Sequence, residues 1–121
     1  MKNIVIDTSF MLTALKFKID IKSELSRILD EKYSLFYIDK TLDELKGKQL
    51  GKLAIQILSS YNAVKINTIS KSNVDSLILD HSKNHPECII ATQDLALKEK
   101  LKKRNVRLIV IRQKTHLKLI N

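Results

Sequence analysis

The stretch Ile4-Val5-Ile6-Asp7-Thr8-Ser9 decides the fold, because it passes directly from an apolar strand to the start of a helix. The β-rich run Asn3–Ile6 predicts a short buried strand that ends at Asp7. The two hydroxyl residues that follow can cap a helix over the apolar stretch Phe10–Leu15. A strand followed at once by a helix is typical of a βαβ unit.

The rest of the chain repeats this alternation of strands and helices. Further strands are expected at Leu35–Ile38, Val64–Ile69, Cys88–Thr92 and Val106–Ile111. Helices are expected at Ile21–Leu29, Lys40–Lys46, Leu50–Tyr61, Val74–Asn84 and Leu95–Lys103. In the third of these helices, Leu50 and Leu53 are expected to face inward, and a basic tail follows the last strand. Because βαβ crossovers are right-handed, the pattern predicts an α/β fold, a three-layer α/β/α sandwich around a central, mostly parallel five-stranded sheet.

The composition excludes several classes of protein. A chain of 121 residues is long enough for one domain with its own core, which we expect to span residues 1–121. The single cysteine, Cys88, lies in an apolar run and is expected to be a buried, reduced thiol, and one cysteine with three histidines cannot supply a closed zinc site. The beginning of the chain is too polar for a signal peptide, and no apolar stretch approaches the roughly 20 residues that span a bilayer. A cytoplasmic protein without membrane association is predicted.

The few acidic residues of this basic chain follow the predicted strands. They are Asp7, Asp39, Asp43, Glu44, Asp75 and Asp94. Because the carboxyl ends of parallel strands and the first turns of their crossover helices share one edge, these side chains are expected to converge there. Helix capping is an alternative role for Asp39 and Asp94. Carboxylates gathered at one edge repel each other unless a cation lies among them, and oxygen ligands select Mg²⁺ or Mn²⁺.

Lysine and arginine outnumber aspartate and glutamate by 22 to 13, which gives a net charge of +9 and favours a polyanionic partner. Nine of the basic residues fall between Lys98 and Lys118. A basic surface around an acidic metal centre is the charge pattern that a nuclease needs. The residues that we expect to contact the nucleic-acid backbone are Lys98, Lys102, Lys103, Arg104, Arg112 and Lys114. A solvated helix face is the alternative for some of them, and no interleaved aromatic residues indicate base stacking.

Across nearly its whole length the chain resembles the PIN domains, a family of metal-dependent ribonucleases. The resemblance rests on the opening stretch quoted above, on Leu42-Asp43-Glu44-Leu45, on Val74-Asp75, and on Ile89-Ile90-Ala91-Thr92-Gln93-Asp94 with the helix and strand that follow it. The chain is most similar to small archaeal members related to ribosomal-RNA-processing endonucleases, and more distantly to toxin ribonucleases. The stretches typical of that subgroup are Gly51-Lys52-Leu53-Ala54 and Arg112-Gln113-Lys114-Thr115-His116-Leu117.

The resemblance implies an acidic quartet that binds one or two divalent ions, Mg²⁺ or Mn²⁺, and carries the catalysis. The quartet is Asp7, Glu44, Asp75 and Asp94, and the hydroxyls expected to orient it or the water of the metal are those of Thr8, Ser9 and Thr92. Asp43 is the alternative to Glu44, which is favoured by the family pattern and by its longer reach. Asp80 is the alternative to Asp75, which is favoured because it lies in the first turn of its helix. Many members have a further acid shortly after the position of Asp94, and its absence here argues against a second tightly bound metal.

The function predicted from these observations is a divalent-metal-dependent endoribonuclease, acting in ribosomal RNA processing or as a toxin-type ribonuclease. The alternative is a non-cleaving RNA-binding or ribosome-assembly module with the same fold, which would show salt-sensitive RNA binding without a metal-dependent product. The implied partners are RNA, a second copy of the chain in a homodimer, and an antitoxin or a pre-ribosomal particle.

Overall fold

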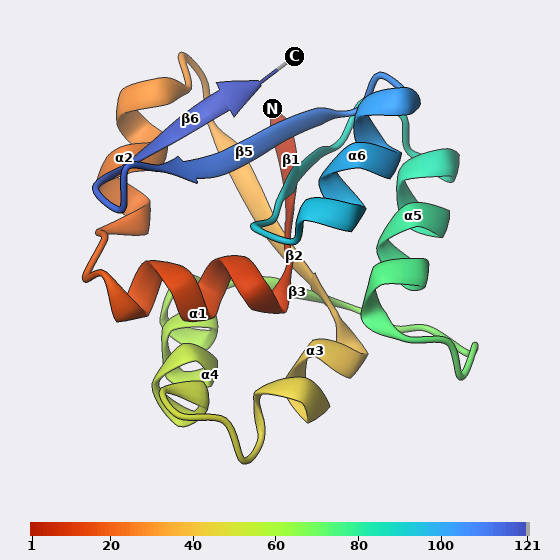
Figure 1. Ribbon diagram of the computed structural model, residues 1–121, viewed down its shortest axis with the longest axis horizontal. Coiled ribbons are helices and arrows are strands. Elements are labelled where there is room, and N and C mark those ends of the chain that lie inside the picture. Colours follow the sequence, from red (N-terminus) through yellow and green to blue (C-terminus); the bar gives the residue numbers. More distant parts are fainter. Residues whose placement is uncertain (121) are drawn as a thin grey trace.

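Six strands form one sheet in the computed structural model, which describes residues 1–120 (Figure 1). The strands are β1 (Lys2–Ile6), β2 (Tyr33–Ile38), β3 (Val64–Ile66), β4 (Ile89–Ala91), β5 (Arg107–Arg112) and β6 (His116–Ile120). Their order across the sheet is β3-β2-β1-β4-β5-β6, and all neighbours are parallel except β5 and β6. The strand order reverses between β1 and β4, which is the position where open α/β sheets place their ligand sites.

Six helices cover the two faces of the sheet in the described part of the chain. They are α1 (Thr8–Lys16), α2 (Ile21–Ile28), α3 (Asp39–Leu45), α4 (Gly51–Ser60), α5 (Val74–Asn84) and α6 (Leu95–Lys103). Ile4 and Ile6 of β1 belong to one buried cluster with α1 to α4, whereas Val5 belongs to a second cluster with α5 and α6. This division follows from the alternation of side chains along a strand. The predicted three-layer, mostly parallel architecture is therefore confirmed.

The predicted five-stranded sheet was one strand short. The chain turns at Gln113 and Lys114, which have φ values of 53° and 60°, and returns as β6 where we expected only a basic tail. Leu117 is buried and its neighbour Lys118 is exposed, so β6 has the alternation of a half-buried edge strand. The alternation is short and lies among basic residues, which obscured it in the sequence.

Two polar side chains of α2 hold β6 in place. Glu24 Oε1 accepts a hydrogen bond from the backbone N–H of Leu117 (2.8 Å), and Arg27 Nη2 donates to the carbonyl oxygen of Leu117 (2.8 Å). Arg27 also pairs with Glu24, with Nε 2.9 Å from Oε2. The hydrogen bonds from Arg27 and from the Leu117 backbone lower the pKa of Glu24 from 4.5 to about 2.

We expect the stabilising effect of Glu24 to disappear in acid. Because its pKa is lowered on folding, its contribution is complete above pH 4.5 and is lost as the pH falls toward 2. Replacement by glutamine should lower the free energy of unfolding by about 1 to 2 kcal/mol at pH 6, and this difference should shrink steadily in urea titrations between pH 5 and pH 2.5. The exposed Glu99→Gln variant is the control. A pH-independent difference between Glu24→Gln and the wild type would contradict the assignment.

Three predictions for apolar residues are wrong. Ile69, which we expected in the third strand, lies beyond the end of β3 and is fully exposed. Leu50 and Leu53, which we expected to face inward, are 38% and 43% exposed. Helix α4 begins only at Gly51, and it buries Gly51, Ala54 and Leu58, which lie on one side of the helix. Cys88 is buried, as expected. Within residues 1–120 we find no helix with the length and apolar character needed to cross a membrane.

Candidate active site

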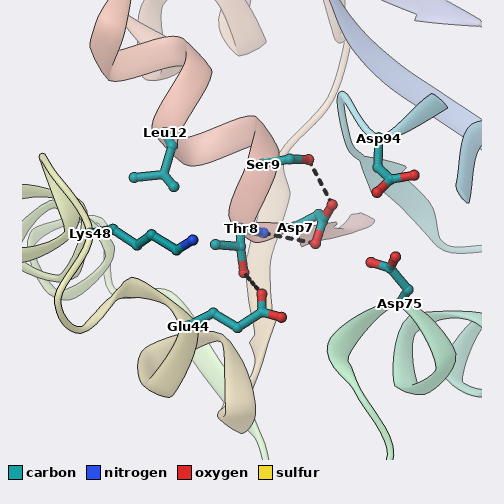
Figure 2. Close-up of a pocket in the computed structure, with 8 residues that line it drawn as sticks. All are labelled: Asp7, Thr8, Ser9, Leu12, Glu44, Lys48, Asp75 and Asp94. Atoms are coloured by element: carbon teal, nitrogen blue, oxygen red, sulfur yellow. Dashed lines mark hydrogen bonds between the residues drawn. The ribbon is translucent and has the colours of Figure 1, made fainter. Parts of the chain in front are cut away.

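A cavity of about 360 Å³ opens at the edge of the sheet where β1 and β4 end, and four acidic residues line it (Figure 2). Its lining residues are Asp7, Thr8, Ser9, Leu12, Glu44, Lys48, Asp75 and Asp94. The structure thus brings together all four members of the predicted acidic quartet. The two alternatives lie elsewhere: Asp43 is 74% exposed and pairs with Lys46, and Asp80 is exposed on α5.

Asp7 lies at the centre of the site and is only 3% exposed. Its Oδ1 accepts a hydrogen bond from the backbone N–H of Thr8 (2.8 Å). Its Oδ2 accepts from the hydroxyls of Ser9 (2.8 Å) and Thr92 (2.7 Å). Three donors from two segments therefore fix the orientation of this carboxylate.

Asp7 is also the N-cap of α1, which corrects our prediction that Thr8 or Ser9 caps this helix. Because α1 begins at Thr8, both hydroxyl residues lie within its first turn and their side chains are directed at carboxylates. Thr8 Oγ1 donates to Glu44 Oε1 (2.6 Å), which joins α1 to α3. The hydroxyls thus connect two members of the quartet to the protein around them.

The fourth acid is held by the segment that follows β4. Asp94 caps α6 through a hydrogen bond from the backbone N–H of Leu97 to Oδ1 (2.9 Å), and its own N–H donates to Thr92 Oγ1 (3.1 Å). Gln93, which we did not predict, donates its N–H to Ser9 Oγ (3.2 Å) and accepts the Ile111 N–H at Oε1 (2.6 Å). Gln93 therefore ties the Asp94 segment to both α1 and β5.

Burial and the charges of the neighbouring carboxylates both disfavour the ionised form of Asp75. Burial raises the pKa of Asp75, and the negative charges of Asp7, Asp94 and Glu44 raise it further. Figure 2 shows the carboxylates of Asp75 and Asp94 directed toward each other and toward Asp7. A site with these properties favours a bound cation.

The donor atoms of the quartet are all oxygen, the element that Mg²⁺ and Mn²⁺ prefer. Among residues 1–120, no three or more histidine, cysteine, aspartate or glutamate side chains lie close enough together to hold a metal ion between them. The carboxylates thus surround a cavity and do not meet at one point. This arrangement fits Mg²⁺, which usually keeps several waters and takes only one or two protein carboxylates.

Asp39 has a different role from the quartet. It accepts hydrogen bonds from the backbone N–H (3.0 Å) and the hydroxyl (2.6 Å) of Thr68, which lower its pKa from 3.8 to about 2. It does not cap α3, because the N-cap residue is Ile38. Asp39 instead fixes the connection from β3 to α5, the helix that carries Asp75.

The basic residues predicted to bind RNA lie outside the cavity. They are Lys98, Lys102, Lys103, Arg104, Arg112 and Lys114, of which only Lys98 is not exposed. Burial lowers the pKa of Lys98, and the charges of Lys102 and Arg112 lower it further, so these three cations lie close together. Their role in RNA binding stays a prediction.

Two residues that line the cavity were missed in the sequence, Leu12 and Lys48. The only signal for Lys48 was its place between Gly47 and Gly51, in the connection from α3 to α4. Among the described residues, Lys48 is the one basic side chain that lines this cavity.

Comparison with known proteins agrees with the fold. A family model described as "PIN like domain" matches residues 4–114. Ribonuclease VapC4 of Methanocaldococcus jannaschii is 32% identical over 129 aligned residues, covering 98% of this chain and 97% of that protein. The structure of the PIN domain endonuclease Utp24 superimposes with a TM-score of 0.87 and 22% identity, covering 97% of this chain and 90% of that one. The chain therefore belongs to the family of PIN-like domains.

Proposed function

We propose that this protein is a divalent-metal-dependent endoribonuclease that hydrolyses phosphodiester bonds of RNA at the acidic cavity. The observation that carries the proposal is the convergence of four carboxylates, from four separate segments of the chain, on one open cavity. The near full-length similarity to a protein named as a ribonuclease supports it.

Mg²⁺ or Mn²⁺ would bind among Asp7, Glu44, Asp75 and Asp94, with one or two of these carboxylates contacting the ion directly and the others contacting its waters. Such an ion, when bound, polarises a phosphoryl oxygen and makes water a stronger nucleophile. The chain itself supplies orientation: Ser9 and Thr92 hold Asp7, and Thr8 holds Glu44. Partners of this kind fix metal ligands in place and raise their effectiveness.

The RNA backbone would be held by the predicted basic residues, which are Lys98, Lys102, Lys103, Arg104, Arg112 and Lys114. Lysine and arginine contacts with phosphates position a nucleic acid without reading its sequence. A role in ribosomal RNA processing or as a toxin-type ribonuclease stays a prediction from the resemblance, as do the homodimer and an antitoxin or pre-ribosomal partner.

The proposal is tested with an end-labelled single-stranded RNA incubated with the protein in Mn²⁺, in Mg²⁺ and in excess EDTA. We expect shortened products with either metal and none in EDTA, with activity restored when the metal is added back in excess. Salt-sensitive RNA binding without any metal-dependent product would favour the alternative, a non-cleaving RNA-binding module.

We also expect Asp75→Asn to stabilise the metal-free protein. Because the pKa of Asp75 is raised on folding, its ionised form opposes folding at neutral pH, and an uncharged amide removes this cost. The melting temperature in EDTA should rise by about 3 °C, whereas the rise that Mn²⁺ produces should become smaller than in the wild type. Calorimetry with and without Mn²⁺ measures both effects.

Asp80→Asn is the matched control, because Asp80 is exposed on the same helix and does not line the cavity. Equal responses to Mn²⁺ in the two variants would contradict the assignment of Asp75 to the metal.

A further inference from the structure

We propose that Lys48 binds a phosphate of the RNA backbone that neighbours the phosphate being cleaved; this rests on the proposed function, which makes RNA the substrate. Lys48 lines the cavity together with the four acids. Figure 2 shows its ammonium group directed toward Thr8, on the side of the cavity opposite Asp75 and Asp94. The lysine therefore lies beside the group of carboxylates and not within it.

The negative charges around the cavity explain why a positive charge at Lys48 would help RNA to bind. A phosphodiester that enters the site meets four carboxylates, and a metal ion offsets their repulsion only where it is bound. Lys48 supplies a positive charge on the other side, where the next phosphate of the strand would lie. A flexible ammonium group is well suited to bind a phosphate as a point charge.

The ammonium group of Lys48 is available for this contact. Among residues 1–120 it forms no ion pair with a carboxylate, although Glu44 lines the same cavity. The neighbouring Lys46 pairs with Asp43 at 3.7 Å. In the connection from α3 to α4, Lys46 is therefore paired with a carboxylate, whereas Lys48 is directed at the cavity and is free to pair with a ligand.

The backbone around Lys48 is held in a defined conformation. Its N–H donates to the carbonyl oxygen of Leu45 (3.2 Å), and its own carbonyl accepts from the N–H of Gly51 (3.0 Å). Gly47 and Leu50 have φ values of 78° and 68°, which turn the chain sharply on either side of the lysine. Because the backbone is already ordered, binding a phosphate has to order only the side chain of Lys48 and not the connection that carries it.

A phosphate contact predicts a particular kind of defect. It carries no sequence information, so its loss should weaken binding of all single-stranded RNAs to a similar degree. It also releases counterions, so its loss should make the dependence of log K on log salt less steep by about 0.7 for a single strand.

The experiment compares Lys48→Met, Lys48→Arg and Lys46→Met with the wild type on two short RNAs of unrelated sequence. Fluorescence polarisation in Ca²⁺, a hard cation that also takes oxygen ligands, gives affinity and salt dependence with a divalent ion present among the carboxylates. Mn²⁺ assays give kcat and KM. We expect Lys48→Met to lower kcat/KM by roughly 10- to 100-fold, mainly through KM, and to lose about 0.7 of the salt slope on both RNAs. Lys48→Arg should recover most of the affinity. Lys46→Met should resemble the wild type.

The inference is overturned if Lys48→Met and Lys46→Met give the same affinity and the same salt slope, whether or not the protein cleaves RNA. A different result would separate the two proposals. If Lys48→Met binds RNA more weakly than the wild type but neither protein forms a product, the phosphate contact is supported and the proposed nuclease function is refuted. Because Lys48 is exposed, its replacement should leave the melting temperature unchanged, so a loss of binding reports on the contact and not on folding.

Discussion

Replacement of Asp7 by asparagine is expected to lower metal-dependent RNA cleavage by at least about 100-fold. The loss of even an outer partner of a metal ligand costs about 10- to 100-fold, and Asp7 is the most buried of the four acids that line the cavity. Asparagine keeps an oxygen that can accept the Thr8 N–H, and it is a good helix N-cap, so α1 should remain intact. The effect should therefore appear in catalysis and in Mn²⁺ binding while the protein stays folded.

Asp20→Asn provides the matched control for this variant. Asp20 is also an aspartate N-cap, with its carboxylate accepting the N–H of Ser23 at the start of α2, but it does not line the cavity. Cleavage rates, melting temperatures and calorimetric titrations with Mn²⁺ should be measured for both variants. Undiminished cleavage by Asp7→Asn would remove Asp7 from the catalytic site.

Replacement of Gly51 by alanine should give the largest loss of stability. A Cβ atom at this position would lie 1.8 Å from the carbonyl oxygen of Leu45, which belongs to the backbone and cannot rotate away. The connection between α3 and α4 would have to shift. We expect a cost of about 3 kcal/mol, or a decrease of about 10 °C in the melting temperature.

Gly47→Ala is the natural comparison, because Gly47 lies in the same connection and is needed for a different reason. Nothing lies within 4 Å of a Cβ placed there, and only its φ of 78° is unfavourable for alanine. Its replacement should cost about 1 kcal/mol. Urea denaturation that finds the two variants equally stable would show that the approach of Gly51 to Leu45 is not a tight constraint.

The sequence predicted the parts of the molecule in which local pattern and topology agree. The acids were placed at one edge because each follows a predicted strand, and parallel strands end together. Glu44 was preferred to Asp43 by the family pattern and by its longer reach, and Asp75 was preferred to Asp80 by its position in the first turn of its helix. Both line the cavity.

The remaining features depend on contacts that no local pattern encodes. The position of Lys48 is set by a turn between two helices, and that of Gln93 by Ile111 in another strand. β6 is held by Arg27, which is 90 residues away from Leu117. The exposure of Leu50 follows from its left-handed conformation just before α4, which the apolar pattern could not reveal.

The position of β1 in the middle of the sheet has a consequence for synthesis of the protein. Asp7 leaves the ribosome early, but its partner Thr92 is 85 residues further along the chain, and Asp94 is later still. Contacts between such distant segments form slowly and only after both segments are available. A nascent chain with its first three strands carries part of the acidic cavity and lacks the β4 side of it. We therefore expect the growing polypeptide to be inactive toward RNA until most of its length has been translated.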